Sequence, residues 1–406
     1  MTKRITRREF TKLTLTAAIL PATGISIGSF QTAPPSGHFR YDRSVVIDNL
    51  ASPGPFNVPG RMDSPLTDEM MSNSRKSGIT AVNVTVNSGI GDKAFEQTVS
   101  SIGYWEREIA EHPEFLMKIR RVGDILKAKK DRKLGLIFGF QNTNMLGQDV
   151  NFLVTFHNLG IRIVQLTYNL KNSVGDGCLQ PNAGGLTSFG KEVVNKMNEM
   201  GLLIDLSHCS TKTTRESILA SDQPVSITHS GCKAVYDHPR SKRDEELKLM
   251  ANRGGVIGIY MMPFLNANDQ PTSEHLLAHI EHAVNVCGED HVGIGSDLSI
   301  TPHVVTDEYI AQHIKFAEIR NSAGIAAPRE DEFFFVKDMN SALRMEMIGN
   351  KLLERGHSVD RVEKILGKNW ERLFKEVWRD LALAYNFPLP LNSLARFLRT
   401  LKLKGF

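Results

Sequence analysis

The amino-acid sequence predicts an α/β protein built as a closed (β/α)8, TIM-type barrel with extra C-terminal helices. Eight short apolar runs recur along the chain, and amphipathic helical stretches separate them. The length of 406 residues is sufficient for one large barrel domain. Most of the runs are continuously apolar, as expected for parallel strands that are buried on both faces.

The eight predicted strands follow one another from residue 45 to residue 298. They lie at residues 45–50, 79–86, 133–141, 162–169, 202–208, 224–230, 256–262 and 291–298. Helical stretches are predicted at residues 95–130, 188–200, 211–220, 245–252 and 273–287. A doubly wound open sheet is the alternative fold, but no glycine-rich phosphate-binding turn follows the first run. Eight strands with helical spacers therefore favour the barrel.

Two flanking segments extend beyond the predicted strands. Residues 340–406 are predicted to be largely helical, with Trp370, Leu373 and Trp378 at helical spacing as packing residues. Residues 1–36 are predicted to be an export signal followed by a linker, which is rich in Gly, Ser, Thr and Pro. Residues 37–406 then form a single domain, the barrel with its helical extension.

The N-terminal segment has the features of a twin-arginine export signal. Arg7 and Arg8 precede a mildly apolar stretch that is interrupted by Pro21 and Gly24. This pattern predicts an exported, periplasmic protein that uses the twin-arginine export machinery. A cytoplasmic basic tail is one alternative, and retention of the uncleaved signal as a membrane anchor is another.

Composition narrows the classes of partner. The net charge is +4 and no long basic run follows the N-terminus, so the sequence predicts no nucleic-acid partner. The four cysteines form no C-x-x-C pair. Cys209 and Cys232 are expected to be buried free thiols, with a disulfide between them as the alternative. We expect a small molecule as the partner, and a homodimer remains open.

Polar residues gather at the C-terminal ends of the predicted strands, where barrel enzymes place their chemistry. These residues are Gln141, Tyr168, Asn169, His208, His229 and Asp297. His208 and His229 end adjacent strands, which lie about 5 Å apart, so their imidazoles can converge on one metal ion. Two structural histidines, each hydrogen-bonded at a strand end, are the alternative.

Asp297 and Arg240 have side chains suited to acid–base chemistry and to substrate binding. A carboxylate at the end of the last strand can move a proton between water and a leaving amine. Arg240 follows the sixth run on a loop, where its guanidinium can hold a carboxylate through two hydrogen bonds. The alternatives are a helix N-cap for Asp297 and a surface salt bridge for Arg240.

Four motifs together resemble the membrane (renal-type) dipeptidase family, peptidase family M19, from about residue 45 to residue 379. They are Asp205-Leu206-Ser207-His208, Thr228-His229-Ser230, His238-Pro239-Arg240 and Gly293-Ile294-Gly295-Ser296-Asp297. The resemblance implies a metallo-dependent hydrolase-like barrel that cleaves dipeptides with two zinc ions bridged by a glutamate. It also implies that His208 and His229 bind the second zinc ion, Asp297 is the acid/base, and Arg240 holds the substrate carboxylate.

The sequence departs from the family pattern at four positions. Leu50 and Ser52 stand where the family has the histidine and aspartate of the first zinc site. Gln141 replaces the bridging glutamate and carries no charge, and Tyr168 replaces a substrate-binding histidine. These departures predict a reduced site with one zinc ion, or with none.

The sequence therefore predicts a zinc-dependent, dipeptidase-like hydrolase of dipeptides or other small amides. Asp297 is the expected catalytic residue, and His208 and His229 are the expected metal ligands. The expected substrate-binding residues are Arg240, Tyr168, Asn169 and Gln141. The alternative function is a non-peptidase periplasmic protein that binds or matures a metabolite on the same barrel.

Overall fold

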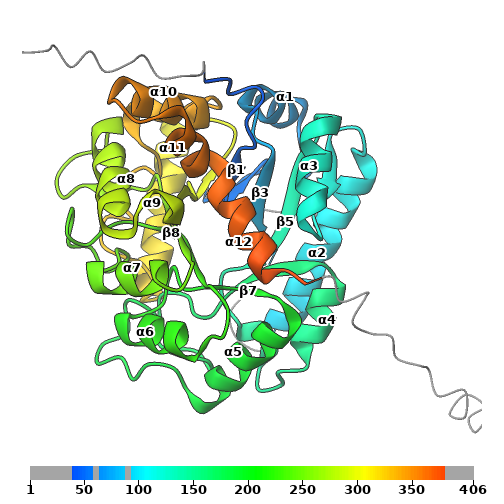
Figure 1. Cartoon of the computed structure of the whole chain (residues 1–406), viewed down its shortest axis with the longest axis vertical. Helices are drawn as coiled ribbons and strands as arrows, with labels where there is room; N and C mark the ends of the chain where they lie inside the picture. The colour runs from blue at the N-terminus through cyan, green and yellow to red at the C-terminus, as the bar shows by residue number, and fades with distance from the viewer. Residues whose placement is uncertain (1–38, 58–63, 87–92, 380–406) are drawn as a thin grey trace, which may run out of the picture. The chain divides into compact units, whose positions relative to one another are not determined.

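The computed structural model describes residues 39–57, 64–86 and 93–379, and in them eight parallel strands close into a barrel (Figure 1). The barrel strands are β1 (Ile47–Asp48), β3 (Ala81–Thr85), β5 (Leu134–Phe140), β6 (Ile161–Gln165), β7 (Leu203–Asp205), β8 (Ser226–Ser230), β9 (Val256–Ile259) and β10 (Val292–Ile294). The ring order is β3-β1-β10-β9-β8-β7-β6-β5, and pairing of β3 with β5 closes it. Each strand falls on one of the eight predicted runs, so the barrel prediction is confirmed.

The prediction of one helical stretch at residues 95–130 is wrong between residues 112 and 121, where the chain is not helical. The chain there forms α2 (Ala94–Glu111), strand β4 (Leu116–Lys118) and α3 (Val122–Asp131). Pro113 lacks an N–H group and disfavours helical backbone in the residue before it, so α2 ends at this point. Strand β4 pairs with β5 outside the closed ring.

Helices surround the barrel strands (Figure 1). They include α1 (Asp68–Ser77), α4 (Phe152–Asn158), α5 (Ser188–Met200), α6 (Thr211–Ala220), α7 (Asp244–Ala251), α8 (Ser273–Cys287) and α9 (Asp307–Ser322). The predicted bounds of α5, α6 and α8 agree with the structure. Thr187 and Ser210 cap α5 and α6 by accepting hydrogen bonds from backbone N–H groups of the first turn, which accounts for these sharp starts.

The C-terminal extension covers the N-terminal end of the barrel. It comprises α10 (Arg344–Glu354), α11 (Val359–Glu363), a π-helical turn (Lys364–Lys368) and α12 (Asn369–Val377). Trp370, Leu373 and Phe374 of α12 are fully buried in one cluster with strand residues such as Ile47 and Leu203. The predicted packing role of Trp370 and Leu373 is confirmed, and Trp378 follows α12 and stacks on Phe374 with ring centroids 4.2 Å apart.

Several predictions fall on the chain termini. The predicted export signal and linker, residues 1–36, lie outside the described residues, as does the predicted helical tail beyond Arg379. None of the described helices combines the length and the apolar character needed to cross a membrane. Cys209 and Cys232 are both free thiols, as expected.

Candidate active site

The candidate site lies at the C-terminal ends of the barrel strands. Beyond β1 and β10 the chain continues into two short strands, β2 (Ala51–Ser52) and β11 (Leu298–Ser299), which pair in parallel. The strands β7 and β8 end beside His208 and His229, on the same rim. Parallel strands bring all their C-terminal ends to one face, which is why residues far apart in sequence meet here.

His208 and His229 face each other through the same ring atom. Their Nε2 atoms are 2.9 Å apart, and the ring centroids are 4.9 Å apart. Both side chains are buried, with 4% and 0% of their surfaces exposed. The partner of each Nδ1 atom decides what the facing Nε2 atoms can do, because a neutral imidazole has one donor nitrogen and one acceptor nitrogen.

The Nδ1 atom of His208 carries the proton. It lies 2.6 Å from Oδ1 of Asn169, whose amide orientation is set by a second contact: Nδ2 of Asn169 donates to the carbonyl oxygen of Ile325 at 2.8 Å. An amide oxygen only accepts hydrogen bonds, so Nδ1 of His208 is the donor. The Nε2 atom of His208 therefore presents a lone pair to His229.

The same assignment holds for His229. Its Nδ1 atom lies 2.8 Å from the hydroxyl of Thr228, and that hydroxyl donates its hydrogen to Oδ2 of Asp205 at 2.7 Å. Asp205 is buried and also accepts from the hydroxyl of Ser207 at 2.6 Å and from the backbone N–H groups of Ser207 and Thr228. Thr228 can then only accept from His229, so Nε2 of His229 presents a second lone pair.

Two imidazole lone pairs that point at each other are placed to bind one cation between them. Burial, reinforced by the charge of Arg240, holds the pKa values of His208 and His229 well below their usual range, so a shared proton is disfavoured. Hydrogen bonding of the far ring nitrogen is also the usual arrangement of a metal-ligating histidine. A tetrahedral zinc ion would separate the two nitrogens by about 3.3 Å, so a small outward shift admits it. The donor set thus fits a metal ion.

A third ionisable ligand does not join this pair. Within the described parts of the chain, three carboxylate, imidazole or thiol ligand atoms come within 4.8 Å of one another only at Glu108, Glu111 and His112, at the C-terminal end of α2. Glu108 there accepts hydrogen bonds from the backbone of Leu66 at 3.0 Å and from Arg107 at 3.2 Å, which accounts for its burial without a metal.

Leu50, Ser52 and Gln141, at the positions that bind the first zinc ion in the family, have structural roles in this chain. Leu50 is buried, and its carbonyl oxygen accepts from the backbone N–H of Asp297 at 2.8 Å. The Ser52 hydroxyl accepts from the backbone N–H of Gly54 at 3.1 Å. Gln141 is half-buried, and its amide Nε2 donates to the hydroxyl of Thr85 at 2.8 Å. These side chains offer no anionic ligand.

Asp297 sits at a sharp backbone kink between β10 and β11. Its φ of +65° is a conformation that aspartate tolerates better than most residues. The side chain is buried, and Asn57 donates to its Oδ1 at 3.1 Å and to its carbonyl oxygen at 2.7 Å. Burial raises the pKa of Asp297 to about 7, against the opposing effect of Arg240. A carboxyl with this pKa can both take up and release a proton near neutral pH.

Arg240 is buried next to the two histidines. Its Nη1 donates to the carbonyl oxygen of Ser207 at 2.6 Å, and its Nη2 donates to that of His229 at 3.3 Å. Its guanidinium therefore ties together the rim ends of β7 and β8. Its charge also lowers the pKa of Asp297, which places both groups within electrostatic reach of each other.

Tyr168 covers one face of His208. The two rings stack with centroids 4.2 Å apart and an interplanar angle of 22°. Arg320, from α9, donates to the Tyr168 hydroxyl at 3.3 Å and forms a buried ion pair with Glu330. A segment that follows the barrel strands in sequence thus positions the side chain that replaces the family's histidine.

Sequence reasoning missed several of these supporting residues. Asp205 belongs to one of the four motifs shared with the family. An acidic residue at the end of a buried strand was a signal that it orients a neighbouring side chain, here His229 through Thr228. Arg320, Glu330 and Asn57 carry no local signal, since they reach the site only through the fold. Asp48, also at a strand end, forms a buried ion pair with Arg344 at 3.3 Å and is thereby a structural residue.

Comparison with known proteins places the chain among described protein families. The family model described as membrane dipeptidase (peptidase family M19) matches residues 67–310. An amidohydrolase from Pseudomonas aeruginosa has a similar solved structure, with 32% sequence identity and a TM-score of 0.72. That match covers 83% of this chain and 98% of the other.

Two curated fungal relatives are named as dipeptidases. Dipeptidase tcpJ of Claviceps purpurea is 26% identical over 73% of this chain and 63% of its own length. Dipeptidase verJ of Clonostachys rogersoniana is 28% identical over 50% of this chain and 53% of its own length. The chain thus spans less than two thirds of the length of either relative.

Proposed function

The chain belongs to the membrane dipeptidase family, peptidase family M19, and we propose that it is a hydrolase of dipeptides or other small amides with a one-zinc site. One observation supports this most directly. The Nε2 atoms of His208 and His229 lie 2.9 Å apart with their lone pairs directed at each other, and the Nδ1 atom of each ring has a hydrogen-bond partner. Two neutral imidazoles in this arrangement would supply two of the ligands of a zinc site.

The residues of the rim have different proposed roles in amide hydrolysis. His208 and His229 would hold the ion, which supplies Lewis-acid polarisation when bound. Asp297 takes a proton from the attacking water and gives one to the leaving amine, since its pKa of about 7 allows both. Arg240 gives the site the positive charge that attracts the free carboxylate of a dipeptide, whereas the charge of Arg320 is paired with Glu330.

Tyr168 and Gln141 are the proposed neutral contacts to the substrate, and Asn169 acts on the site through His208. Tyr168 presents an aromatic ring that is already stacked on His208, so a substrate side chain meets a flat apolar surface there. Asn169 fixes the ring of His208 through its amide oxygen, so its contribution is to orient the metal ligand. Gln141 lies on the β5 side of the rim, bonded to Thr85.

Metal content and dipeptide hydrolysis, measured on the same purified chain, test the proposal. We expect a single zinc ion per chain and hydrolysis of a panel of L,L and L,D dipeptides that stops when a chelator removes the ion. Two zinc ions per chain would show that ligands of a first site were overlooked. No metal and no hydrolysis would reject the proposal.

A second function is favoured by the replaced positions. Leu50, Ser52 and Gln141 remove every anionic ligand of the first zinc site. A non-peptidase periplasmic protein that binds or matures a metabolite would retain the rim as a binding pocket. Tight binding of a small carboxylate without turnover, by a chain that holds no metal, would favour this second function.

Export is part of the proposal and can be tested separately. Changing Arg7→Lys and Arg8→Lys together is expected to leave the protein in the cytoplasm, because the twin-arginine machinery reads the arginine pair. Fractionation of cells that express the variant and the parent chain, followed by immunoblotting, measures the periplasmic share. A variant that reaches the periplasm as efficiently as the parent would contradict the twin-arginine assignment.

A further inference from the structure

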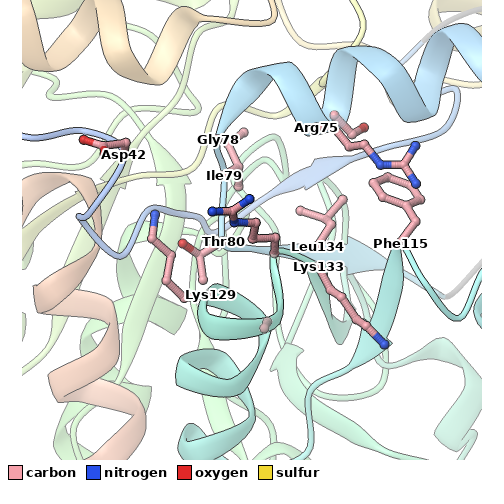
Figure 2. A pocket seen from close by; sticks show the side chains of 12 residues that line it. Asp42, Arg75, Gly78, Ile79, Thr80, Phe115, Lys129, Lys133 and Leu134 are labelled. Atoms are coloured by element: carbon pink, nitrogen blue, oxygen red, sulfur yellow. The ribbon is translucent and has the colours of Figure 1, made fainter.

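We propose that a basic pocket at the N-terminal end of the barrel binds a small ligand that carries a phosphate group. The pocket has a volume of about 380 Å³ and lies between the ends of α1 and α3 and the starts of β3 and β5 (Figure 2). Its size falls in the range of small-molecule sites, about 300–1,000 Å³. We call it the basal pocket. It is lined by Asp42, Ser74, Arg75, Gly78, Ile79, Thr80, Phe115, Ala128, Lys129, Arg132, Lys133 and Leu134.

The charged residues of the basal pocket are mostly basic. Arg75, Lys129, Arg132 and Lys133 line it, and Asp42 is the acidic residue among its lining. Asp42 is already neutralised by Arg40, which lies outside the lining and donates to both carboxylate oxygens at 3.0 and 2.9 Å. The lining therefore attracts anions more strongly than its composition alone indicates.

Two helices end at the basal pocket, and their termini offset part of this charge. The C-terminus of a helix carries about half a negative charge, so α1 and α3 together contribute about one. Arg75 also faces Glu114 at 3.6 Å, a long and exposed contact. After these offsets about two positive charges remain without a counter-charge. Basic residues that merely stabilise helix ends would not need this surplus.

The charged groups of Lys129 and Arg132 have no hydrogen-bond partner among the described residues. Neither forms an ion pair with any other residue in the described parts of the chain. Lys129 is half-buried, and this burial lowers the pKa of its ammonium group despite the nearby charge of Asp42. A bound anion would restore the interactions that burial removes from Lys129.

The uncharged lining indicates what else the ligand carries. The Ser74 side chain is 2% exposed, and its hydroxyl has no hydrogen-bond partner in the described structure. A phosphate oxygen is a suitable acceptor for this buried donor. Ile79, Phe115 and Leu134 supply apolar surface, and the guanidinium of Arg75 lies 4.7 Å from the centre of the Phe115 ring. A phosphate ester with a small apolar or aromatic group matches this lining.

The basal pocket is separate from the proposed active site. Its residues lie before or at the starts of β3 and β5, whereas His208, His229 and Asp297 lie at the C-terminal ends of other strands. The inference therefore does not depend on the proposed hydrolase function. The phosphate can belong to a soluble phosphomonoester or to a phospholipid headgroup, and the two sources can be distinguished.

The test uses the full chain and two double variants with equal loss of charge. Lys129→Gln/Arg132→Gln removes two cations from the basal pocket. Lys76→Gln/Lys130→Gln removes two exposed lysines from the same helix ends, outside the lining, and is the matched control. Phenyl phosphate binding is measured by calorimetry, and binding to vesicles of phosphatidylglycerol, or of phosphatidylcholine alone, by co-sedimentation.

We expect phenyl phosphate to bind the parent chain and the control, and the pocket variant to bind at least about tenfold more weakly. The same dependence seen only with phosphatidylglycerol vesicles would also support the site and would assign its ligand to a lipid headgroup. Circular dichroism and thermal melting verify that both variants fold. No binding of either probe, or equal weakening by both double variants, would overturn the inference.

Discussion

The double substitution His208→Ala/His229→Ala is expected to remove all bound zinc and, with it, metal-dependent hydrolysis. Both Nε2 lone pairs disappear, and the described structure supplies no other ionisable ligand close to them. Metal content per chain, measured by elemental analysis of the purified variant, is the primary readout. Thermal melting is the second, because Asn169 and Thr228 lose their buried partners and the variant should be less stable.

His112→Ala provides the matched control for metal loss. It removes one imidazole from the group on α2, where Glu108 and Glu111 are the neighbouring acids. We expect this variant to retain its zinc and its activity. Loss of zinc from His112→Ala, with zinc retained in the double variant, would move the metal site to α2 and contradict the assignment.

Asp297→Asn is expected to lower kcat by about 10²- to 10⁴-fold with little change in KM. Asparagine has nearly the same shape, tolerates a positive φ and can keep the hydrogen bonds with Asn57, so the fold should survive. It cannot exchange a proton. The wild-type pH–rate profile should show a transition near pH 7, where Asp297 titrates, and the variant should lack it.

The same substitution has a defined effect on stability. The pKa of Asp297 in the folded chain, about 7, lies above its usual value of 3.8. Between these values the folded state keeps a proton that the unfolded state has released, so the contribution of Asp297 to stability falls as pH rises. Relative to Asp297→Asn, the wild type should lose free energy of unfolding from about pH 4 to about pH 7 and then level off. A constant difference would contradict the raised pKa.

The closed barrel could be predicted because its signal is local. Each parallel strand is buried on both faces and appears as a short apolar run, as at residues 133–141 and 202–208. Helices α5 and α6 were recognisable from their amphipathic spacing, and the structure adds that Thr187 and Ser210 cap their first turns. The strand β4 was missed, because its three residues lie between two helices and look like a continuation of them.

The site could be predicted only as a set of residue types at strand ends. His208, His229 and Asp297 lie at the ends of the predicted strands, and the barrel brings strand ends together, so their gathering on one rim was foreseeable. That Leu50, Ser52 and Gln141 lack anionic ligand groups was equally visible, since it is a property of the side chains themselves.

Only the tertiary structure decided how those side chains act. The lone pairs of the two histidines are directed by Asn169, Thr228 and Asp205, and the pKa of Asp297 is raised because the folded chain removes it from water. Arg320 reaches Tyr168 across 152 residues of sequence, from a helix that follows the barrel strands. Hydrogen-bond direction and desolvation depend on contacts between distant segments, whereas hydrophobic periodicity reports only on neighbours along the chain.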